Sequence, residues 1–227
     1  MEGAIILFLE ILGIVAFAVS GAVTAIEKGL DVFGVVFIGV ITALGGGVIR
    51  DIILGIFPPI MFTYKIYAVT SIIASLIVFL TAYADKDRFY NNIDKIDAIV
   101  NVFDAVGIGL FAVSSVQRCI QYGYGDNTFL CIMMSMTTCI GGSIMRDLLC
   151  QKLPAVLRKR IYALATIAGG ALYYYMFKFG IGREISMVAG VGITIAIRLL
   201  ATKYKWNMPR IKKRHINFTI ICKSLVL

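Results

Sequence analysis

The sequence predicts an all-α polytopic membrane protein with seven transmembrane helices, arranged as two inverted three-helix repeats plus one extra helix. Three observations support this fold class. Of the 227 residues, 59% are hydrophobic, and the mean hydropathy of +0.89 is too high for a soluble domain of this size. Several apolar runs reach the roughly 20 residues that a helix needs to cross a ~30 Å hydrocarbon core. One stretch of the chain also occurs twice.

The repeated stretch contains a run of small residues followed by an Arg-Asp pair. Its first copy is residues 42–51 (TALGGGVIRD) and its second is residues 138–147 (TCIGGSIMRD). Glycine runs free the backbone to unwind, and unwound backbone at membrane depth survives only where it is buried in protein or lines a wet cavity. We therefore expect the second and fifth helices to be broken at Gly45–Gly47 and Gly141–Ser143. Gly-interrupted segments at matching places in two halves point to a transport site.

The predicted helices are apolar runs of sufficient length, separated by polar turns or prolines. The first run has no basic region before it and is too long for a signal-peptide core, so we interpret it as a retained helix. Pro58 and Pro59 stop the second helix, because proline cannot continue the helix ladder, and Pro154 stops the fifth. The seven helices are expected at Gly3–Ile26, Val32–Ile56, Lys65–Tyr83, Ala98–Cys119, Thr128–Cys150, Arg160–Lys178 and Glu184–Ala201.

The similarity between the two halves extends beyond the glycine motif. Residues 10–21 and 104–115 share an acid, a glycine and the letters FAVS at the same spacing, and KIYA from residue 65 matches RIYA from residue 160. Three spans per repeat turn the second copy upside down relative to the first. The expected domains are residues 1–84 as the first repeat, 85–97 as a charged cytoplasmic loop that links the halves, 98–179 as the second repeat, 180–201 as the seventh helix and 202–227 as a basic cytoplasmic tail.

The basic residues predict the orientation in the membrane. With the helices above, five lysines and arginines fall in the connections on one side, and sixteen fall on the other side, including the tail. The side richer in Lys and Arg faces the cytoplasm. The N-terminus is therefore expected outside and the C-terminus inside, in a bacterial plasma membrane.

The two Arg-Asp pairs are the leading candidates for function, since a charged group in hydrocarbon is expensive and normally has both a partner and a role. Arg50–Asp51 and Arg146–Asp147 either gate the two mouths of one pathway or lock the helices together, and the sequence leaves both open. Glu10 and Asp104 occupy equivalent places in the first and fourth helices, either inside the pathway or at the interface.

The glycines also allow more than one interpretation. A broken helix exposes carbonyl groups, which suit a cation, and a half-helix N-terminus, which suits a carboxylate. The sequence does not choose between these ligands. A simpler alternative is that glycine only lets two helices pack closely.

Other residue types exclude several classes of function. The formal net charge of +9 is concentrated in loops and the tail, which indicates topology and lipid headgroup contact rather than nucleic-acid binding. The five cysteines form no CxxC pair and no metal spacing, so we expect small core residues rather than ligands or disulfides. The single histidine, His215, lies in the tail, and no Ser/His, Cys/His or metal-spaced carboxylate set is present. No enzyme activity, metal site or cofactor is expected.

At these motifs the chain resembles the bacterial TRIC-type (trimeric intracellular cation channel) family, which is also described as a family of bacterial glycine transporters. The resemblance rests on the two Gly-Gly-x-x-x-Arg-Asp motifs, the proline after each and the Phe-Ala-Val-Ser before each, and it covers roughly Ile5–Ala201. It implies a 3+3+1 arrangement of helices, a homotrimer, and a pathway in each protomer between the kinked second and fifth helices. The site residues it implies are Gly45, Gly46, Gly47, Arg50, Asp51, Gly141, Gly142, Ser143, Arg146 and Asp147.

Two positions depart from a symmetric pattern. Ser143 replaces the third glycine of the first copy, and Gln151 lies opposite Gly55. The leading hypothesis is a passive monovalent-cation (potassium) channel whose partners are the lipid bilayer, two further copies and the transported ion. A glycine or small amino-acid transporter that uses the same site is the alternative. A membrane scaffold that transports nothing, with glycines that only permit packing, is a third hypothesis.

Overall fold

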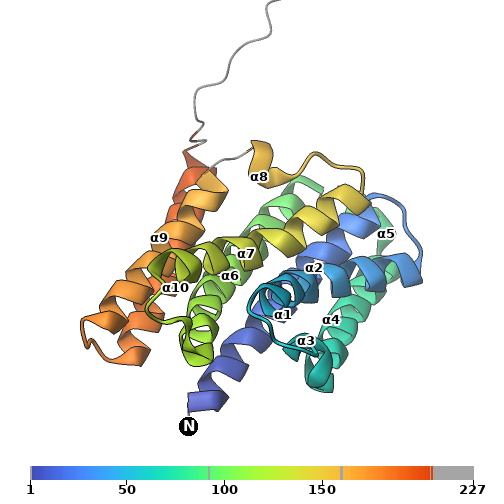
Figure 1. Ribbon diagram of the computed structural model, residues 1–227. Coiled ribbons are helices and arrows are strands. Elements are labelled where there is room, and N and C mark those ends of the chain that lie inside the picture. The colour runs from blue at the N-terminus through green and yellow to red at the C-terminus, as the bar shows by residue number, and fades with distance from the viewer. Residues whose placement is uncertain (1, 92, 159–160, 205, 207–227) are drawn as a thin grey trace, which may run out of the picture.

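A computed structural model describes residues 2–91, 93–158, 161–204 and 206, and every regular element in these ranges is helical (Figure 1). Most of the predicted tail, including His215 and Cys222, lies outside the described residues. The helices are α1 (Glu2–Glu27), α2 (Val32–Ile53), α3 (Ile60–Thr63), α4 (Lys65–Ala84), α5 (Lys86–Asn91), α6 (Ile93–Cys119), η1 (Ile120–Tyr124), α7 (Thr128–Leu149), α8 (Ala155–Arg158), α9 (Ile161–Lys178) and α10 (Arg183–Lys203).

Each predicted membrane helix corresponds to a helix of the structure, and six of those described are long and apolar enough to span a bilayer: α1, α2, α4, α6, α7 and α10. Their outward faces carry exposed side chains such as Phe33, Ile77 and Val188, as lipid contact requires. The remaining helix, α9, is 18 residues long, and the tyrosines at 173–175 lower its hydropathy. Its crossing of the membrane, and hence the seventh span, stays a prediction.

The predicted breaks in the second and fifth helices are wrong. Both α2 and α7 are 22-residue helices that continue through Gly45–Gly47 and Gly141–Ser143. Each is about 33 Å long at ~1.5 Å per residue, enough for one crossing. The apolar run looked too long because it includes the turn after the helix, where Gly55 adopts a φ of 72°. The glycines instead bring two intact helices into close contact.

The linker between the halves differs from the predicted loop. Residues 86–91 form α5, and α6 begins at Ile93 rather than at Ala98. The charged residues Lys86 and Asp87 at the start of α5 are exposed, so their side chains can reach water while the backbone stays hydrogen-bonded.

The same local chemistry delimits α2 and α7. Asp31 and Asn127 are the N-cap residues, and their side chains accept hydrogen bonds from the backbone N–H of Gly34 (2.8 Å) and Leu130 (3.0 Å), which satisfies donors that a helix start leaves unpaired. Both helices end in the same turn, with backbone bonds from residue 56 to Asp51 and from residue 152 to Asp147. Gln151 occupies the left-handed position of Gly55 with a φ of 51°.

The helices form two three-helix units with matching contacts. Helices α1, α2 and α4 pack on one another, as α6, α7 and α9 do, and the units meet along α1–α6 and α2–α7. The short helices α3 and α8 lie at opposite ends of the bundle (Figure 1). This is the arrangement of two copies related by a twofold axis that runs between α2 and α7. Helix α10 packs on α9 and α6, outside both units.

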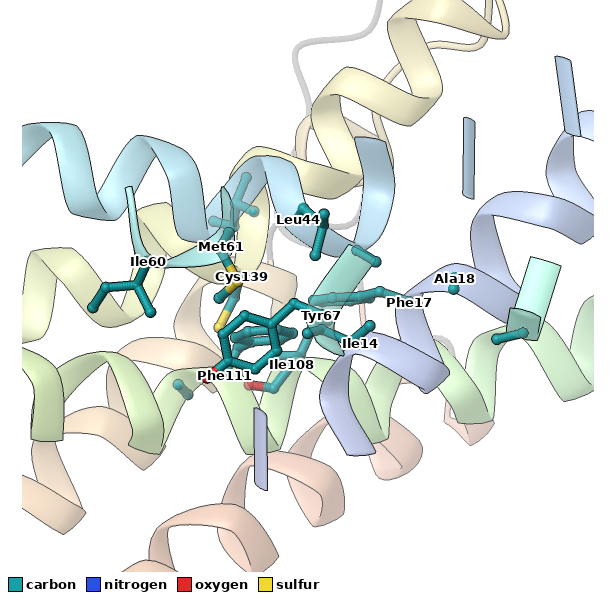
Figure 2. Close-up of a cluster of buried hydrophobic side chains, with 14 of the residues drawn as sticks. Ile14, Phe17, Ala18, Leu44, Ile60, Met61, Tyr67, Ile108, Phe111 and Cys139 are labelled. Carbon is teal, nitrogen blue, oxygen red and sulfur yellow. Dashed lines mark hydrogen bonds between the residues drawn. The ribbon is translucent and has the colours of Figure 1, made fainter. Parts of the chain in front are cut away.

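The centre of the bundle is a stacked aromatic pair on that axis. The rings of Phe17 and Phe111 lie 5.4 Å apart and nearly parallel, in the buried cluster that Figure 2 shows. Each ring covers a glycine of the opposite unit, because a Cβ at Gly13 would lie 2.8 Å from Phe111 and one at Gly107 would lie 2.9 Å from Phe17. Two equivalent phenylalanines thereby fix how the units face each other.

Candidate functional site

The contact between α2 and α7 is made by the glycines that the sequence singled out. A methyl group on Gly46 would collide with the backbone carbonyl of Thr138, and one on Gly142 would collide with the carbonyl of Thr42. Because the obstacle is backbone in both cases, no side-chain movement can relieve it. The two helices therefore touch at a pair of equivalent points.

At one end of this contact lies the first cluster, which consists of Glu10, Arg50, Asp51, Tyr67 and Arg118. Glu10 on α1 accepts hydrogen bonds from Tyr67 (2.6 Å) and Arg50 (3.3 Å), and Arg118 bonds both of its oxygens at 3.1 and 2.7 Å. Arg50 also donates to Asp51 at 2.9 Å. Glu10, Arg50 and Asp51 are 0% exposed. Two arginines and two carboxylates leave the cluster electrically balanced.

Asp51 also shapes the chain that follows α2. Its second carboxylate oxygen accepts a hydrogen bond from the backbone N–H of Ile60 at 2.8 Å. Ile60 is the first residue of α3, directly after Pro58 and Pro59. The carboxylate therefore pairs with Arg50 and also caps the short helix that returns the chain to the bundle.

At the other end lies the second cluster, which consists of Asp104, Arg146, Asp147, Tyr162 and Arg198. Arg146 donates to Asp147 at 2.8 Å and to Asp104 at 3.3 Å. Arg198, from α10, approaches Asp104 at 3.4 Å and lies over the ring of Tyr162 at 4.3 Å. This cluster again balances two arginines against two carboxylates.

The tyrosines of the two clusters have different partners. Tyr67 reaches Glu10, whereas Tyr162, at the equivalent place on α9, donates to the hydroxyl of Ser143 at 2.9 Å. Ser143 replaces Gly47, where a Cβ would lie 2.5 Å from Met61. The serine that breaks the symmetry of the motif thus supplies the acceptor that the shorter Asp104 does not.

Three buried hydroxyl groups belong to Ser20, which contacts the second cluster, and to the two threonines at the glycine contact, Thr42 and Thr138. Glu10 and Ser20 of α1 are ten residues apart, and Ser20 accepts a hydrogen bond from Arg146 at 2.6 Å, so the clusters are separated by about 15 Å along the helix. The Thr42 hydroxyl donates to the carbonyl of Ile38 and lies beside Gly21, where a Cβ would be 2.6 Å from it. The equivalent hydroxyl of Thr138 is buried and has no hydrogen-bond partner among the described residues.

The structure brings the predicted candidates together in equivalent groups. Both Arg-Asp pairs are buried, and Glu10 and Asp104 belong to the clusters rather than to the lipid interface. Gly46 and Gly142 lie at the helix contact, whereas Gly45 and Gly141 approach the side chains of Met145 and Ile49. In the described part of the chain, no group of three or more His, Cys, Asp and Glu is placed to hold a metal ion.

Four residues of the clusters were not predicted from the sequence: Tyr67, Tyr162, Arg118 and Arg198. The repeated Ile-Tyr-Ala letters were a signal for the tyrosines. Arg198 was also detectable, as a single charge inside the apolar run of the last helix. Arg118 stands at the end of its helix, like an ordinary connection residue, and nothing local indicates its bond to Glu10.

Long apolar helices around two buried and balanced ion clusters define a multi-pass membrane protein. A family model described as "Glycine transporter" matches residues 7–83 and again residues 101–178, and the chain belongs to this family. The two matched stretches coincide with the two three-helix units. The UPF0126 inner membrane protein YadS of Escherichia coli (strain K12) is 32% identical over 90% of this chain and 95% of its own length, and the protein described here is likewise a plasma-membrane protein.

Solved structures show the same fold. The TRIC trimeric intracellular cation channel orthologue from Rhodobacter sphaeroides is 31% identical, with a TM-score of 0.80 over 89% of this chain and 99% of its own. A prokaryotic TRIC channel with a crystal structure in 0.5 M KCl is 34% identical, with a TM-score of 0.80 over 92% of this chain and all of its own. The resemblance inferred from the two motifs is thereby confirmed.

Proposed function

We propose that this protein is a cation channel whose pathway in each protomer follows the contact between α2 and α7. The observation that carries the proposal is the pair of buried ion clusters at the two ends of this contact, each built on one Arg-Asp pair. Buried charges at membrane depth mark ion pathways. The structural similarity to proteins described as TRIC cation channels supports the same activity.

Conduction requires α2 and α7 to separate, since the glycine contacts close the path. The carbonyl groups of continuous helices are engaged in backbone bonds, so they cannot serve as the ion ligands expected from a broken helix. In the proposal, hydroxyl groups are the ion ligands instead. Thr138, whose hydroxyl is unpartnered among the described residues, and Thr42 are the residues that meet Gly46 and Gly142 at the helix contact, where a dehydrated cation needs oxygen ligands.

The proposal also includes the transported ion, the oligomeric state, the seventh span and the orientation in the membrane. Potassium is the transported ion, the chain assembles as a homotrimer, and α9 is the remaining transmembrane helix. The N-terminus lies outside, which places the first cluster toward the outer face and the second toward the cytoplasm. The two Arg-Asp pairs then act at the two mouths of one pathway.

A glycine transporter that uses the same contact is the second candidate, and the description of the matching family favours it. Potassium current through purified protein in a planar bilayer, recorded with and without glycine, separates the two. Discrete steps that persist without glycine are expected for the channel. If a folded sample gives no steps but accumulates labelled glycine in proteoliposomes, the channel proposal is wrong.

Two neighbouring glycines provide a matched pair of variants for the pathway. We expect Gly46→Ala to change unit conductance or open probability several-fold, because its methyl group meets the carbonyl of Thr138 and pushes the helices apart. Gly45→Ala meets only the sulfur of Met145, the movable end of a side chain, and should conduct like the wild type. Equal currents from both folded variants would contradict the proposal that the pathway follows the contact between α2 and α7.

A further inference from the structure

Two buried cysteines lie in contact where α6 passes into α7. The sulfur atoms of Cys119 and Cys131 are 3.1 Å apart, and both residues are 0% exposed. A disulfide bond is about 2.05 Å long, so the sulfurs need to approach by only about 1 Å. Cys139 and Cys150 are also buried and free, and among the described residues the sulfur of Cys139 contacts the backbone carbonyl of Ile108 instead.

The other repeat shows that packing does not require sulfur at these positions. The equivalent residues at the α1–α2 turn are Ala25 and Val35, both 0% exposed and members of one hydrophobic cluster. An aliphatic pair therefore fills the same space in the same local fold. The paired thiols add a chemical capability that the first repeat does not have.

The connection around the thiols contains a turn that the first repeat lacks, although both connections are exposed. It contains the extra turn η1, in which Gly123 has a φ of 86°, and residues 121–124 are exposed. The sulfur of Cys131 lies 3.4 Å from the backbone carbonyl of Tyr124. The exposed turn at Tyr124 therefore covers the sulfur of Cys131, and opening of this turn admits a small oxidant.

We propose that Cys119 and Cys131 are a modification site that forms a reversible disulfide. One cysteine thiolate attacks a disulfide oxidant, which releases one thiol and leaves a mixed disulfide, and the second thiolate attacks the protein sulfur of that mixed disulfide and releases the other thiol. One S–S bond forms in the protein, two cysteines lose their protons and two electrons, and the oxidant leaves as two thiols. The proposed orientation places this end at the outer face, where such bonds persist.

The bond would constrain the first cluster. Arg118, which holds Glu10 at 2.7 Å, directly precedes Cys119 on the last turn of α6. A covalent link from Cys119 to α7 therefore fixes the end of the helix that carries this arginine. The assignment of the bond itself does not depend on the proposed transport function.

The test uses the full-length protein purified in detergent and incubated with oxidised glutathione or with dithiothreitol. The protein is then denatured in the presence of N-ethylmaleimide, which labels every free thiol. Trypsin releases one peptide, residues 119–146, that carries Cys119, Cys131 and Cys139. We expect the oxidised peptide to be lighter by two hydrogens and to carry one maleimide, on Cys139. Reduced protein should carry three. Thermal unfolding of the oxidised sample should shift upward by several degrees and return with dithiothreitol.

Two variants keep the result specific. Cys131→Ser should abolish both the mass loss and the thermal shift, whereas Cys139→Ser should retain them. Three maleimides on the oxidised wild-type peptide, a bond that involves Cys139, or stable glutathione adducts on Cys119 and Cys131 would each overturn the proposal. A double variant with Ala25→Cys and Val35→Cys on a Cys119→Ser, Cys131→Ser background tests the equivalent turn. If a disulfide forms between the cysteines introduced at positions 25 and 35 while none forms between Cys119 and Cys131 in the wild type, the proposal is also contradicted.

Discussion

The two ion clusters are built from equivalent positions of the two repeats, but they differ in the exposure of the central acid and in the lengths of its contacts. In the first, Glu10 is 0% exposed and is held by hydrogen bonds as short as 2.6 and 2.7 Å. In the second, the Asp104 side chain is 7% exposed and its two arginine contacts are 3.3 and 3.4 Å long. The equivalent contacts of Arg50 and Arg146 are both 3.3 Å long, so the difference lies in the second arginine, which is 2.7 Å from Glu10 but 3.4 Å from Asp104. The second cluster is therefore the less tightly held of the two.

The difference also shows how substitutions are coupled across the repeats. Replacing glutamate by aspartate removes one methylene, and the tyrosine that would have bonded it turns to Ser143 instead. In the first unit Met61 occupies the space that a Cβ at Gly47 would need, since the two would be 2.5 Å apart. The acid, the tyrosine partner and the residue after the glycines therefore vary as a set.

The largest expected effect is the loss of Glu10. Glu10→Gln leaves Arg50 and Arg118 without their shared counter-charge, and we expect the free energy of unfolding to fall by about 3–5 kcal/mol, as for other broken buried pairs. Asp104→Asn should cost less, about 1–3 kcal/mol, because its contacts are longer and partly solvated. The midpoints of unfolding in detergent check this order.

Glu27→Gln is the control for these two variants. Glu27 pairs with Lys152 at 2.6 Å, but the lysine side chain is 35% exposed, so the loss should stay within about 1 kcal/mol. A greater loss of stability from Asp104→Asn than from Glu10→Gln would reverse the comparison between the clusters.

The next effect concerns the tyrosine hydroxyls. Tyr67→Phe removes a hydrogen bond to a carboxylate and should cost about 1.5–3 kcal/mol, whereas Tyr162→Phe removes one between neutral groups and should cost about 0.5–1.5 kcal/mol. The two variants delete the same atom at equivalent positions, so each controls for the other. Equal losses in unfolding measurements would mean that the two hydroxyls have similar environments.

The smallest net change in the free energy of unfolding is expected when the glycine and serine that pack against each other between α2 and α4 are exchanged. Gly39 of α2 faces Ser75 of α4, whereas the equivalent contact of α7 and α9 pairs Ser135 with Gly170. Gly39→Ser alone collides with Ser75 and should cost about 1–3 kcal/mol. Adding Ser75→Gly restores the arrangement of the other unit and should recover all but about 0.5 kcal/mol. A double variant no more stable than Gly39→Ser would show that the two contacts are not interchangeable.

The glycine motif illustrates where inference from sequence stopped. Its repetition located the contact of the two units, but the predicted breaks at Gly45–Gly47 and Gly141–Ser143 were wrong. A glycine run lowers the cost of unwinding and also permits close helix packing. The choice depends on what faces the glycine, and Gly46 faces the backbone of Thr138, nearly a hundred residues away.

The arginines show a second limit. The pairs Arg50–Asp51 and Arg146–Asp147 are neighbours in sequence, so their association could be predicted. Arg118 meets Glu10 across 108 positions, and Arg198 enters the second cluster from a helix outside the repeats. Such contacts are set by how whole helices rotate and pack, and the local sequence around each arginine does not predict them.

The sequence by itself determined the membrane class, the bounds of most helices, the twofold repetition and the candidate charges. These follow from hydropathy, from turn and capping residues and from letters that recur, all of which act over a few residues. Only the tertiary structure decided that α2 and α7 stay intact, which acid holds which arginine, and that Cys119 touches Cys131. Those outcomes depend on contacts between distant segments, where one methylene or one methyl group changes the partner.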